Sequence, residues 1–401
     1  MKVLITTDAH LYKTPDGKYW CNAIYGYSFW TRFMNVFTNI RIGARVKNVE
    51  KVDSKWKRVD GEKIEIYEIP FYQGPVQLVK KYKKIKRRIK SVADGCDVVI
   101  FRLPSPTGQL IWNEIKNLKI PIGIEVVYDL TDDMKDPNRS KILKLITYVQ
   151  LRFLKKACLS ANGVSYVTEN AIQKNFPSFS RIYGEDEEHF ETFYSTITMN
   201  DKVFTSPRNF IGKNKFCIAM SDVAMNSERK GERVFLNTIA ILRKKGYEIR
   251  GIIIGDGTKR HEFEQLAIDL GIGEYCEFTG LLSSSEEVMQ TLQNADIYVF
   301  PTVAEGLPRG VLEAMAVGMP VVTSPVGGIP EVIQKDYLAM PTDIEKYASI
   351  VEILISNTKL MNKVSQYNYT KSLEFRNAVL QEKRENFYSR LCSLVNNGGN
   401  R

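Results

Sequence analysis

The sequence predicts an α/β fold in two domains, each built on a mainly parallel sheet. The 401 residues are 44% hydrophobic and 25% charged, which is typical of a globular protein but too long for one compact core. Short apolar runs of strand length alternate with helical or irregular segments, and this alternation favours parallel sheets. The periodicity fades between residues 179 and 214, so we place the linker there and the domain boundary after residue 205.

The first domain, residues 1–205, contains five candidate strands, at residues 3–7, 64–69, 98–103, 122–127 and 164–168. Their spacing indicates a Rossmann-type sheet. The stretch 19–37, YWCNAIYGYSFWTRFMNVF, is unusually aromatic. Such rings form a protein core or face carbohydrate or lipid, and the sequence leaves both interpretations open.

The second domain, residues 206–374, contains candidate strands at residues 216–220, 249–254, 276–279, 297–300 and 321–323. A helical pattern follows each strand, which predicts a second Rossmann-like sheet. Beyond Pro341 the pattern is mostly helical, and a last helix falls within about residues 375–401.

The net charge of +10 is unevenly distributed, because residues 80–90 hold eight basic side chains in KKYKKIKRRIK. Apolar residues repeat through this stretch at helical spacing, at Leu78, Tyr82, Ile85 and Ile89. The segment therefore predicts a basic amphipathic helix. It is either ordinary solvated surface or a contact for anionic lipid headgroups. The candidate membrane-contact residues are Lys83, Lys84, Arg87 and Arg88.

Several classes of protein are disfavoured by what the sequence lacks. There is no run of about 18 uncharged apolar residues, so we expect no transmembrane helix. The N-terminus has no signal-peptide core, so we expect a cytoplasmic protein. The six cysteines form no C-x-x-C pair and predict reduced, buried thiols. No zinc-finger or RNP motif supports nucleic-acid binding.

The stretch 295–333 carries the strongest functional signal. It reads as a buried strand, a loop, a helix and a second strand, which together form a βαβ unit. Glu305 follows the first strand and Glu313 lies in the helix, so both carboxylates point toward the carboxyl edge of the sheet, where ligands of open α/β sheets bind. One glutamate could simply cap the helix. Two glutamates separated by seven residues, with Gly306, Pro308 and Gly310 among those seven, indicate a binding site.

Two further segments of this domain indicate a bound anion. Arg229 and Lys230 precede a helix in SERKGERVF, where cations oppose the helix dipole unless an anion is bound there. Gly255 opens GDGTKR at the end of a strand and allows backbone to approach a ligand. The third glycine of a dinucleotide fingerprint is missing, so an NAD or FAD enzyme is disfavoured.

From about Lys215 to Met340 the sequence resembles the retaining nucleotide-sugar glycosyltransferases of the GT-B fold, the family 4-like group 1 enzymes with a Glu-x7-Glu signature. The resemblance implies two Rossmann-like domains facing each other across a cleft, with the last helix returning to the first domain. It also implies hexosyl transfer from a nucleoside-diphosphate sugar, such as a UDP-sugar, to a sugar or lipid-linked sugar. Many relatives act in synthesis of bacterial surface polysaccharides such as capsule, exopolysaccharide, lipopolysaccharide or wall glycan.

By this resemblance, Lys230 followed by Gly231 holds the donor diphosphate. The arginine that relatives carry just after the first strand is replaced by Met220, Ser221 and Asp222, so Arg229 is the candidate substitute. Glu305 would bind the donor sugar and Glu313 the ribose, each by charge-assisted hydrogen bonds. Gly306, Leu307, Pro308, Arg309, Gly310, Val311, Gly255, Gly280 and Leu281 complete the donor site. Pro308 has no N–H to donate.

No D-x-D pair is present, so the resemblance implies transfer without a metal or other cofactor. The resemblance is weak on the acceptor side, where the candidates are Gly17, Tyr128 and Asp129, with Tyr128 where relatives have a histidine. The expected acceptor is a carbohydrate or a polyprenyl-diphosphate-linked sugar, met at the inner face of the plasma membrane. The basic helix and exposed aromatics near residues 25–30 would give peripheral attachment. A sugar-nucleotide epimerase or phosphorylase of the same fold, or a non-catalytic membrane- or nucleic-acid-binding protein, remain alternatives.

Overall fold

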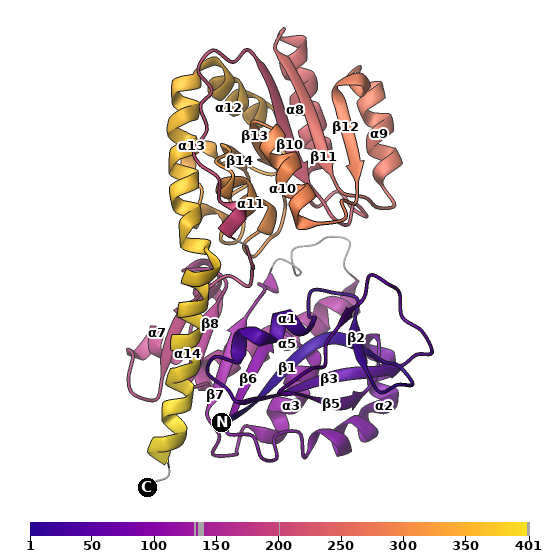
Figure 1. Cartoon of the computed structure of the whole chain (residues 1–401), viewed down its shortest axis with the longest axis vertical. Coiled ribbons are helices and arrows are strands. Elements are labelled where there is room, and N and C mark those ends of the chain that lie inside the picture. The colour runs from indigo at the N-terminus through magenta and orange to yellow at the C-terminus, as the bar shows by residue number, and fades with distance from the viewer. Residues whose placement is uncertain (132–133, 135–139, 200, 399–401) are drawn as a thin grey trace. The chain divides into compact units, whose positions relative to one another are not determined.

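The computed structural model describes residues 1–131, 134, 140–199 and 201–398, which form two compact units (Figure 1). Unit 1 consists of Met1–Tyr194 with Gln381–Arg401, and unit 2 consists of Ser195–Leu380. Each unit is an α/β structure around its own sheet. None of the described helices is both long enough and apolar enough to span a membrane.

The sheet of unit 1 has seven parallel strands in the order β5-β3-β1-β6-β7-β8-β9, extended beside β1 by the antiparallel strands β2 and β4. The strands are β1 Lys2–Lys13, β2 Tyr19–Cys21, β3 Asn39–Asn48, β4 Lys57–Arg58, β5 Ile64–Pro70, β6 Val98–Leu103, β7 Ile122–Val126, β8 Gly163–Tyr166 and β9 Phe190–Phe193. The five strands predicted in this domain are confirmed as β1, β5, β6, β7 and β8.

Strand β3 was not predicted because two arginines interrupt its apolar pattern. Arg41 and Arg45 are nevertheless buried. Arg41 donates to the carbonyl oxygens of Val92 and Asp94, and Arg45 donates to that of Tyr72 at 3.0 Å. Their charged ends are satisfied by loop carbonyls, which allows two cations inside an otherwise apolar strand.

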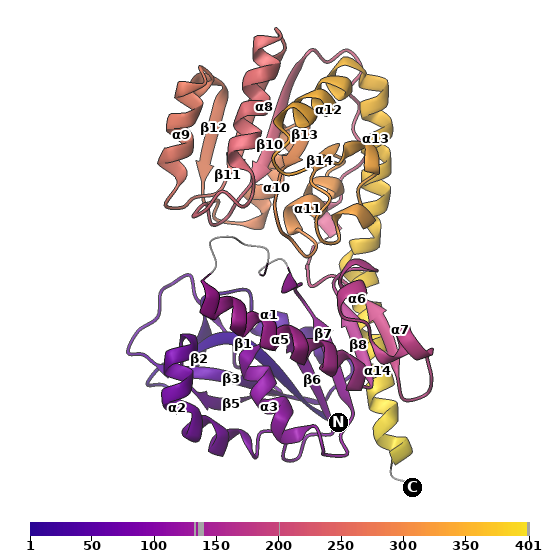
Figure 2. The same cartoon turned by 180° about the vertical axis from the view of Figure 1, so that it is seen from behind.

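Helices cover both faces of this sheet. Figures 1 and 2 show α2, α3 and α5 on one face, and α1 with the end of α14 on the other. The helices are α1 Tyr27–Trp30, α2 Gly74–Ile89, α3 Pro106–Ile115, α5 Lys141–Ser160, α6 Ala171–Asn175, α7 Phe179–Tyr183 and α14 Asn377–Gly398. The predicted basic helix is confirmed as α2, with Ile85 and Ile89 buried on its inner side.

The aromatic stretch 19–37 is mainly core. Phe29, Trp30, Phe33 and Phe37 are all at most 5% exposed, and their rings pack against one another or against Tyr388 of α14. The expectation of exposed membrane-binding aromatics near residues 25–30 is therefore wrong for Phe29 and Trp30.

The last helix, α14, packs on the sheet of unit 1, as the resemblance implied. A Cβ at Gly123 of β7 would lie only 2.5 Å from Leu391, so the glycine lets the helix approach the strand. The hydroxyl of Tyr388 donates to the buried carboxylate of Glu125 at 2.7 Å. Burial alone would raise the pKa of Glu125, but the charge of Arg102 and hydrogen bonds from tyrosine hydroxyls hold it below its usual value.

The sheet of unit 2 has five parallel strands in the order β12-β11-β10-β13-β14. They are β10 Lys215–Ser221, β11 Glu248–Ile254, β12 Cys276–Gly280, β13 Ile297–Phe300 and β14 Val321–Thr323, so all five predicted strands of this domain are confirmed. The helices are α8 Glu232–Lys244, α9 Arg260–Asp269, α10 Ser285–Asn294, α11 Arg309–Ala316, α12 Ile344–Ser356 and α13 Thr358–Ser372.

The structure divides the chain after Tyr194 and Leu380, whereas the sequence placed the boundaries after residues 205 and 374. The segment after Tyr194 belongs to unit 2 because it is bonded to that unit. Arg208 donates to the carbonyl oxygens of Val317 at 2.7 Å and Leu292 at 2.9 Å, and the amide of Thr205 donates to Ala316. Part of the expected linker is regular structure, since α7 and β9 lie within it.

The cysteines are free thiols, as predicted. Cys21, Cys96, Cys158 and Cys217 are buried, and burial raises the pKa of each of them. Neutral, buried thiols of this kind behave as small apolar side chains.

Candidate active site

The donor-side candidates lie at one edge of the sheet in unit 2. The strands are parallel, so the segments that follow them all emerge at their carboxyl ends, where ligands of open α/β sheets bind. Arg229 and Lys230 follow β10, Gly255 follows β11, Gly280 ends β12, and Glu305 follows β13. The structure therefore brings the predicted donor residues to a common edge.

Lys230 is positioned by the turn that starts α8. Gly231, the residue before the helix, has φ +86°, and a Cβ there would lie 2.4 Å from the carbonyl oxygen of Pro301. Only glycine fits this close approach without strain. The backbone of Arg229 is fixed to the same loop, because its carbonyl oxygen accepts from the amide of Val303 at 2.9 Å.

The ammonium group of Lys230 pairs with the carboxylate of Glu305, to which it donates a short hydrogen bond. Both side chains are mostly buried, at 31% and 17% exposed. Burial lowers the pKa of Lys230, an effect that the nearby carboxylate of Asp222 opposes and Arg229 reinforces. We find no partner for the guanidinium of Arg229 among the described residues, so a second cation is available beside Lys230.

The loop that carries Glu305 is supported from behind by a glycine turn. A Cβ at Gly327 would lie 1.9 Å from the carbonyl oxygen of Glu305, and the amide of Gly328 donates to the carbonyl oxygen of Gly306 at 2.6 Å. This packing fixes the backbone of the loop and therefore the point from which the Glu305 side chain extends.

Helix α11 brings Glu313 to the same edge. Glu313 is buried, and its carboxylate accepts from Arg309 Nε at 2.7 Å. Burial raises the pKa of Glu313, and the charge of Arg309 partly offsets this effect. The start of the helix approaches the sheet closely because Gly310 has no side chain: a Cβ there would lie 2.4 Å from the hydroxyl of Tyr298.

The N-terminus of α11 offers backbone donors to an anion. No side chain caps this end of the helix, and its N-cap is Pro308. The first amides of the helix therefore have no intrahelical partner and point outward with the positive end of the dipole. Val311 is fully buried, so only its backbone could reach a ligand, and Leu307 is partly exposed.

The turns at Gly255 and Gly280 pack against each other and against the loop after β10. The amide of Gly255 donates to the carbonyl oxygen of Gly280 at 3.1 Å, and a Cβ at Gly255 would lie 1.8 Å from the carbonyl oxygen of Asp222. Leu281 is 60% exposed at this edge. These positions offer backbone rather than side-chain chemistry to a ligand.

Sequence reasoning missed a buried carboxylate beneath Lys230. Glu232, the first residue of α8, is fully buried, and its carboxyl group lies next to that of Asp222. Burial and the neighbouring Asp222 raise the pKa of Glu232 to about 8, while Lys230 acts in the opposite direction. The sequence around Glu232, ERVFL, does not indicate that this glutamate is buried, because a glutamate in the first turn of a helix is ordinarily exposed.

A cavity of about 490 Å³ opens beside Arg309 and Glu313 within unit 2. Met289, Gln290 and Gln293 of α10 line it. Sequence reasoning also missed these residues, because their spacing marks only an ordinary amphipathic helix. Among the described residues, no three His, Cys, Asp or Glu side chains gather in a way that could hold a metal ion.

The acceptor-side candidates lie in unit 1. Tyr128 and Asp129 follow β7 at the carboxyl edge of the sheet, whereas Gly17 lies in an exposed turn between β1 and β2 with φ +79°. The Asp129 carboxylate accepts from the amide of Thr131 at 2.8 Å and from Asn175 Nδ2 at 2.8 Å. These contacts give Asp129 a role in holding the loop.

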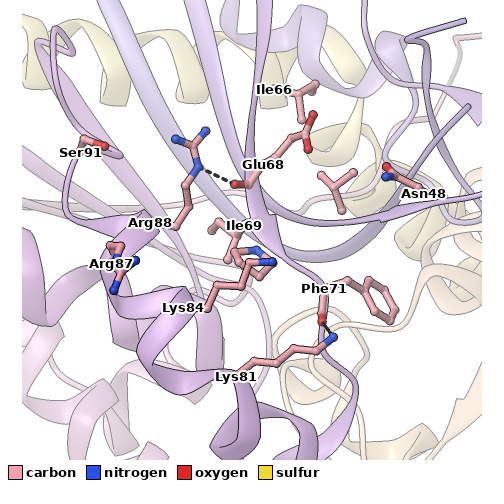
Figure 3. A pocket seen from close by; sticks show the side chains of 12 residues that line it. Asn48, Ile66, Glu68, Ile69, Phe71, Lys81, Lys84, Arg87, Arg88 and Ser91 are labelled. Atoms are coloured by element: carbon pink, nitrogen blue, oxygen red, sulfur yellow. Dashed lines mark hydrogen bonds between the residues drawn. The ribbon is translucent and has the colours of Figure 1, made fainter. Parts of the chain in front are cut away.

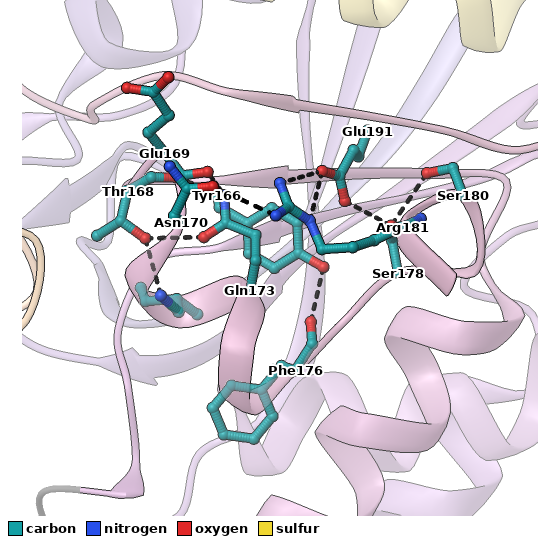
Figure 4. Close-up of polar contacts among 11 residues, drawn as sticks. Tyr166, Thr168, Glu169, Asn170, Gln173, Phe176, Ser178, Ser180, Arg181 and Glu191 are labelled. Atoms are coloured by element: carbon teal, nitrogen blue, oxygen red, sulfur yellow. Dashed lines mark hydrogen bonds and ion pairs between the residues drawn. The ribbon is translucent and has the colours of Figure 1, made fainter. Parts of the chain in front are cut away.

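The segment that follows β8 at this edge is also held by its own polar contacts (Figure 4). Thr168 Oγ1 accepts from the amide of Ile172 at 3.0 Å and donates to Gln173 Oε1 at 3.0 Å, and Arg181 Nε donates to Glu191 at 2.8 Å. This cluster fixes the turn into α6 and α7.

The candidate membrane-contact residues are exposed on α2, but they are not equivalent. Lys84, Arg87 and Arg88 line a pocket of about 930 Å³ between α2 and β5 together with Lys81 (Figure 3), whereas Lys83 does not line it. Arg88 Nε donates to the carbonyl oxygen of Glu68 at 3.0 Å, so Arg88 also ties the helix to β5.

Solved structures of other proteins show which class of fold the two units define. HepE of Anabaena in complex with UDP matches with a TM-score of 0.67 at 15% identity, over 97% of this chain and 100% of that one. Sucrose-phosphate synthase of Thermosynechococcus elongatus matches with a TM-score of 0.68 at 14% identity, over 98% and 99%. The protein has the GT-B fold of glycosyltransferases.

Sequence comparison finds a family model that is similar to part of the chain and relatives that are similar to most of it. Residues 208–371 match the model of glycosyl transferases group 1. Protein CapJ of Staphylococcus aureus is 25% identical over 96% of this chain and 93% of its own length. The putative glycosyltransferase EpsD of Bacillus subtilis is 22% identical over 81% and 84%. The stretch that matches the family model lies within unit 2, which carries the donor-side candidates.

Proposed function

We propose that the protein is a retaining glycosyltransferase that moves a hexosyl group from a nucleoside-diphosphate sugar to a sugar or lipid-linked sugar. The observation that carries the proposal is the pairing of Lys230 with Glu305 at the sheet edge to which α11 also brings Glu313. A cation for phosphate, a carboxylate for sugar hydroxyls and a second carboxylate for ribose are the groups that such a donor requires.

The chemistry follows from the charge that the reaction develops. Negative charge builds on the departing diphosphate, and fixed donors aimed at it lower the barrier. Lys230, the free guanidinium of Arg229 and the first amides of α11 supply such donors. As the diphosphate approaches, it takes the place of Glu305 beside Lys230, and the released carboxylate of Glu305 accepts from the donor sugar.

Glu313 would accept from the ribose hydroxyls of the donor. Its carboxylate is held by Arg309 at 2.7 Å, so it is already oriented before a ligand arrives. HepE of Anabaena has been solved with UDP-glucose, which supports a UDP-sugar as the donor here. We propose that the reaction needs no metal ion, and a rate unchanged by EDTA is the expected result.

Transfer is tested with radiolabelled sugar nucleotides and a membrane extract. A glycosyltransferase moves label into lipid or glycan, whereas an epimerase leaves it in the nucleotide pool. Lys230→Ala should lower kcat/KM by two orders of magnitude or more, since loss of one such donor costs about 3 kcal/mol of transition-state stabilisation. Lys363→Ala, at an exposed lysine of α13, is the matched control. Normal activity in a folded Lys230→Ala protein would contradict the assignment of Lys230 as the cation that binds the donor diphosphate.

Retention is tested separately by the anomeric configuration of the product, determined by NMR against that of the donor. The same configuration in both supports the proposal, and an inverted product contradicts it. This measurement does not depend on which sugar nucleotide proves to be the donor.

We propose that the reaction serves the synthesis of a bacterial surface polysaccharide. This is supported by the amylovoran glycosyltransferase AmsK of Erwinia amylovora, which is 33% identical over 32% of this chain, and by the putative colanic acid glycosyltransferase WcaL of Escherichia coli, 33% identical over 28%. A lipid-linked acceptor places the reaction at the inner face of the plasma membrane.

Peripheral attachment there would use the exposed charges of α2. Lys83→Glu, Lys84→Glu and Arg87→Glu together should strongly weaken binding to anionic vesicles at low salt, because each basic residue near such a surface contributes about 1 kcal/mol. Arg88 is kept, since it also bonds to β5. Unchanged vesicle binding would assign α2 to ordinary solvated surface, and hydrolysis of the sugar nucleotide should be normal in either case.

A further inference from the structure

Helix α5 carries an apolar surface that the described residues of unit 1 leave exposed. Ser140 caps the helix by accepting from the amide of Leu143, and Leu154, Ala157 and Cys158 bury its second half against the sheet. The outward side of the first half carries Ile142, Leu145, Tyr148 and Val149, which we call the α5 stripe. These side chains are 71%, 65%, 48% and 50% exposed.

The α5 stripe departs from the usual design of a surface helix. A helix that covers a sheet turns charged and polar residues toward solvent, and scattered single apolar side chains need no explanation. Here four neighbours at positions i, i+3, i+6 and i+7 share one side of the helix, and a contiguous exposed patch of this kind marks an interaction surface.

The charge around the stripe identifies the kind of partner. Helix α5, KILKLITYVQLRFLKKACLS, contains no acidic residue and five basic ones: Lys141, Lys144, Arg152, Lys155 and Lys156. The last three line a pocket of about 600 Å³ beside the stripe, together with Asn175 and Phe176. Cations beside an apolar floor suit a phosphate attached to a hydrocarbon.

We propose that α5 docks the protein on an anionic lipid bilayer, with the α5 stripe in the interface and the cations of its second half on headgroup phosphates. An apolar side flanked by lysine and arginine is the composition of helices that lie in a membrane surface. A second copy of this chain fits less well, because a symmetric contact would bring five cations against five.

The inference rests on the proposed membrane attachment for its purpose, and it assigns the apolar contact that α2 cannot supply. Figure 2 shows α2 and α5 on the same face of the sheet in unit 1. The two helices should nevertheless differ in salt dependence. Charge on α2 acts mainly at low ionic strength, whereas apolar insertion by α5 persists when salt screens the charges.

The test is vesicle flotation with phosphatidylcholine alone and with added phosphatidylglycerol. The triple variant Ile142→Ser, Leu145→Ser and Val149→Ser should bind the anionic vesicles about tenfold or more weakly at both low and high salt. Ile268→Ser with Ile353→Ser, at equally exposed positions of unit 2, is the matched control and should bind like the parent. Because the removed side chains are exposed, circular dichroism should show the same melting for all three proteins.

Insertion is measured independently with Tyr148→Trp, whose emission should shift to the blue with anionic vesicles only. Binding of the triple variant equal to the parent overturns the proposal. Lys155→Glu with Lys156→Glu should also weaken binding, because these cations lie on headgroup phosphates, and unchanged binding of this double variant would overturn that contact. The proposal is also overturned if the parent is a dimer, the triple variant is a monomer, and both bind vesicles equally. No sugar nucleotide is present, so none of these results bears on transfer, and Lys230→Ala should bind vesicles normally.

Discussion

The buried carboxyl group of Glu232 should make unit 2 less stable as the pH rises. Its pKa in the folded protein is about 8, against 4.5 for an ordinary glutamate, with burial as the main cause and Asp222 as the second. Between these values the unfolded chain has released the proton while the folded protein still holds it. Stability therefore falls with rising pH across this window, by about 1.4 kcal/mol per pH unit, and the fall ends above pH 8.

The whole shift corresponds to up to about 5 kcal/mol of stability present at low pH and absent at high pH, a large share of the stability of a domain. Glu232→Gln removes the titration and keeps the shape of the side chain. We expect the unfolding free energy of unit 2 to be much less dependent on pH in the variant than in the parent between about pH 5 and pH 8.

The assay is scanning calorimetry of parent and variant across this range, with urea unfolding by circular dichroism as a second measurement. Glu274→Gln, at an exposed glutamate of unit 2, controls for loss of a carboxylate and should follow the parent. Parallel pH profiles for parent and Glu232→Gln would refute the reasoning, since they would show that Glu232 keeps an ordinary pKa.

Two other substitutions test the site and the fold. Glu305→Gln should lower kcat more than Glu313→Gln. The reason is that a contact to the sugar strengthens as its ring distorts, whereas a contact to the ribose is equally strong in the ground state and the transition state. If steady-state kinetics show the larger loss of kcat for Glu313→Gln, the two roles are reversed. Tyr388→Phe should lower the unfolding free energy of unit 1 by about 1.5–3 kcal/mol, because a charged, buried Glu125 loses one hydrogen-bond donor. A variant as stable as the parent in urea would contradict that estimate.

Much of the fold could be predicted because its strands are buried on both faces and read as continuous apolar runs. Strand β3 was not predicted because Arg41 and Arg45 interrupt its apolar pattern, and the carbonyl groups that bind them lie in loops distant in sequence. The same limit applies to the domain boundary. Arg208 anchors its segment to unit 2 through carbonyl oxygens about 85 to 110 residues further along the chain, and no local pattern of residue types reports such bonds.

The donor-side candidates were easier to predict from the sequence than the acceptor-side candidates, for a related reason. A Cβ at Gly231 or Gly327 would meet backbone oxygens, and a Cβ at Gly310 would meet side-chain hydroxyls. Each position therefore needs glycine, and glycines are easily noticed in a sequence. The environment of Glu232 depends instead on burial and on Asp222, which sequence spacing does not express. A periodic pattern also does not show whether an apolar side of a helix is buried or exposed. The α5 stripe has the same spacing as the buried side of any amphipathic helix.

The pairing of Lys230 with Glu305 suits the proposed binding of both phosphate and sugar at one location. In the donor-free protein each charge satisfies the other, so neither is left unpaired at a mostly buried position. A free diphosphate would neutralise Lys230 but leave the Glu305 carboxylate facing another anion. A diphosphate that carries a sugar also supplies hydroxyls to Glu305, so the exchange of partners is complete only with the whole donor. Under the proposed function, we therefore expect the site to bind the sugar nucleotide more tightly than the free nucleoside diphosphate.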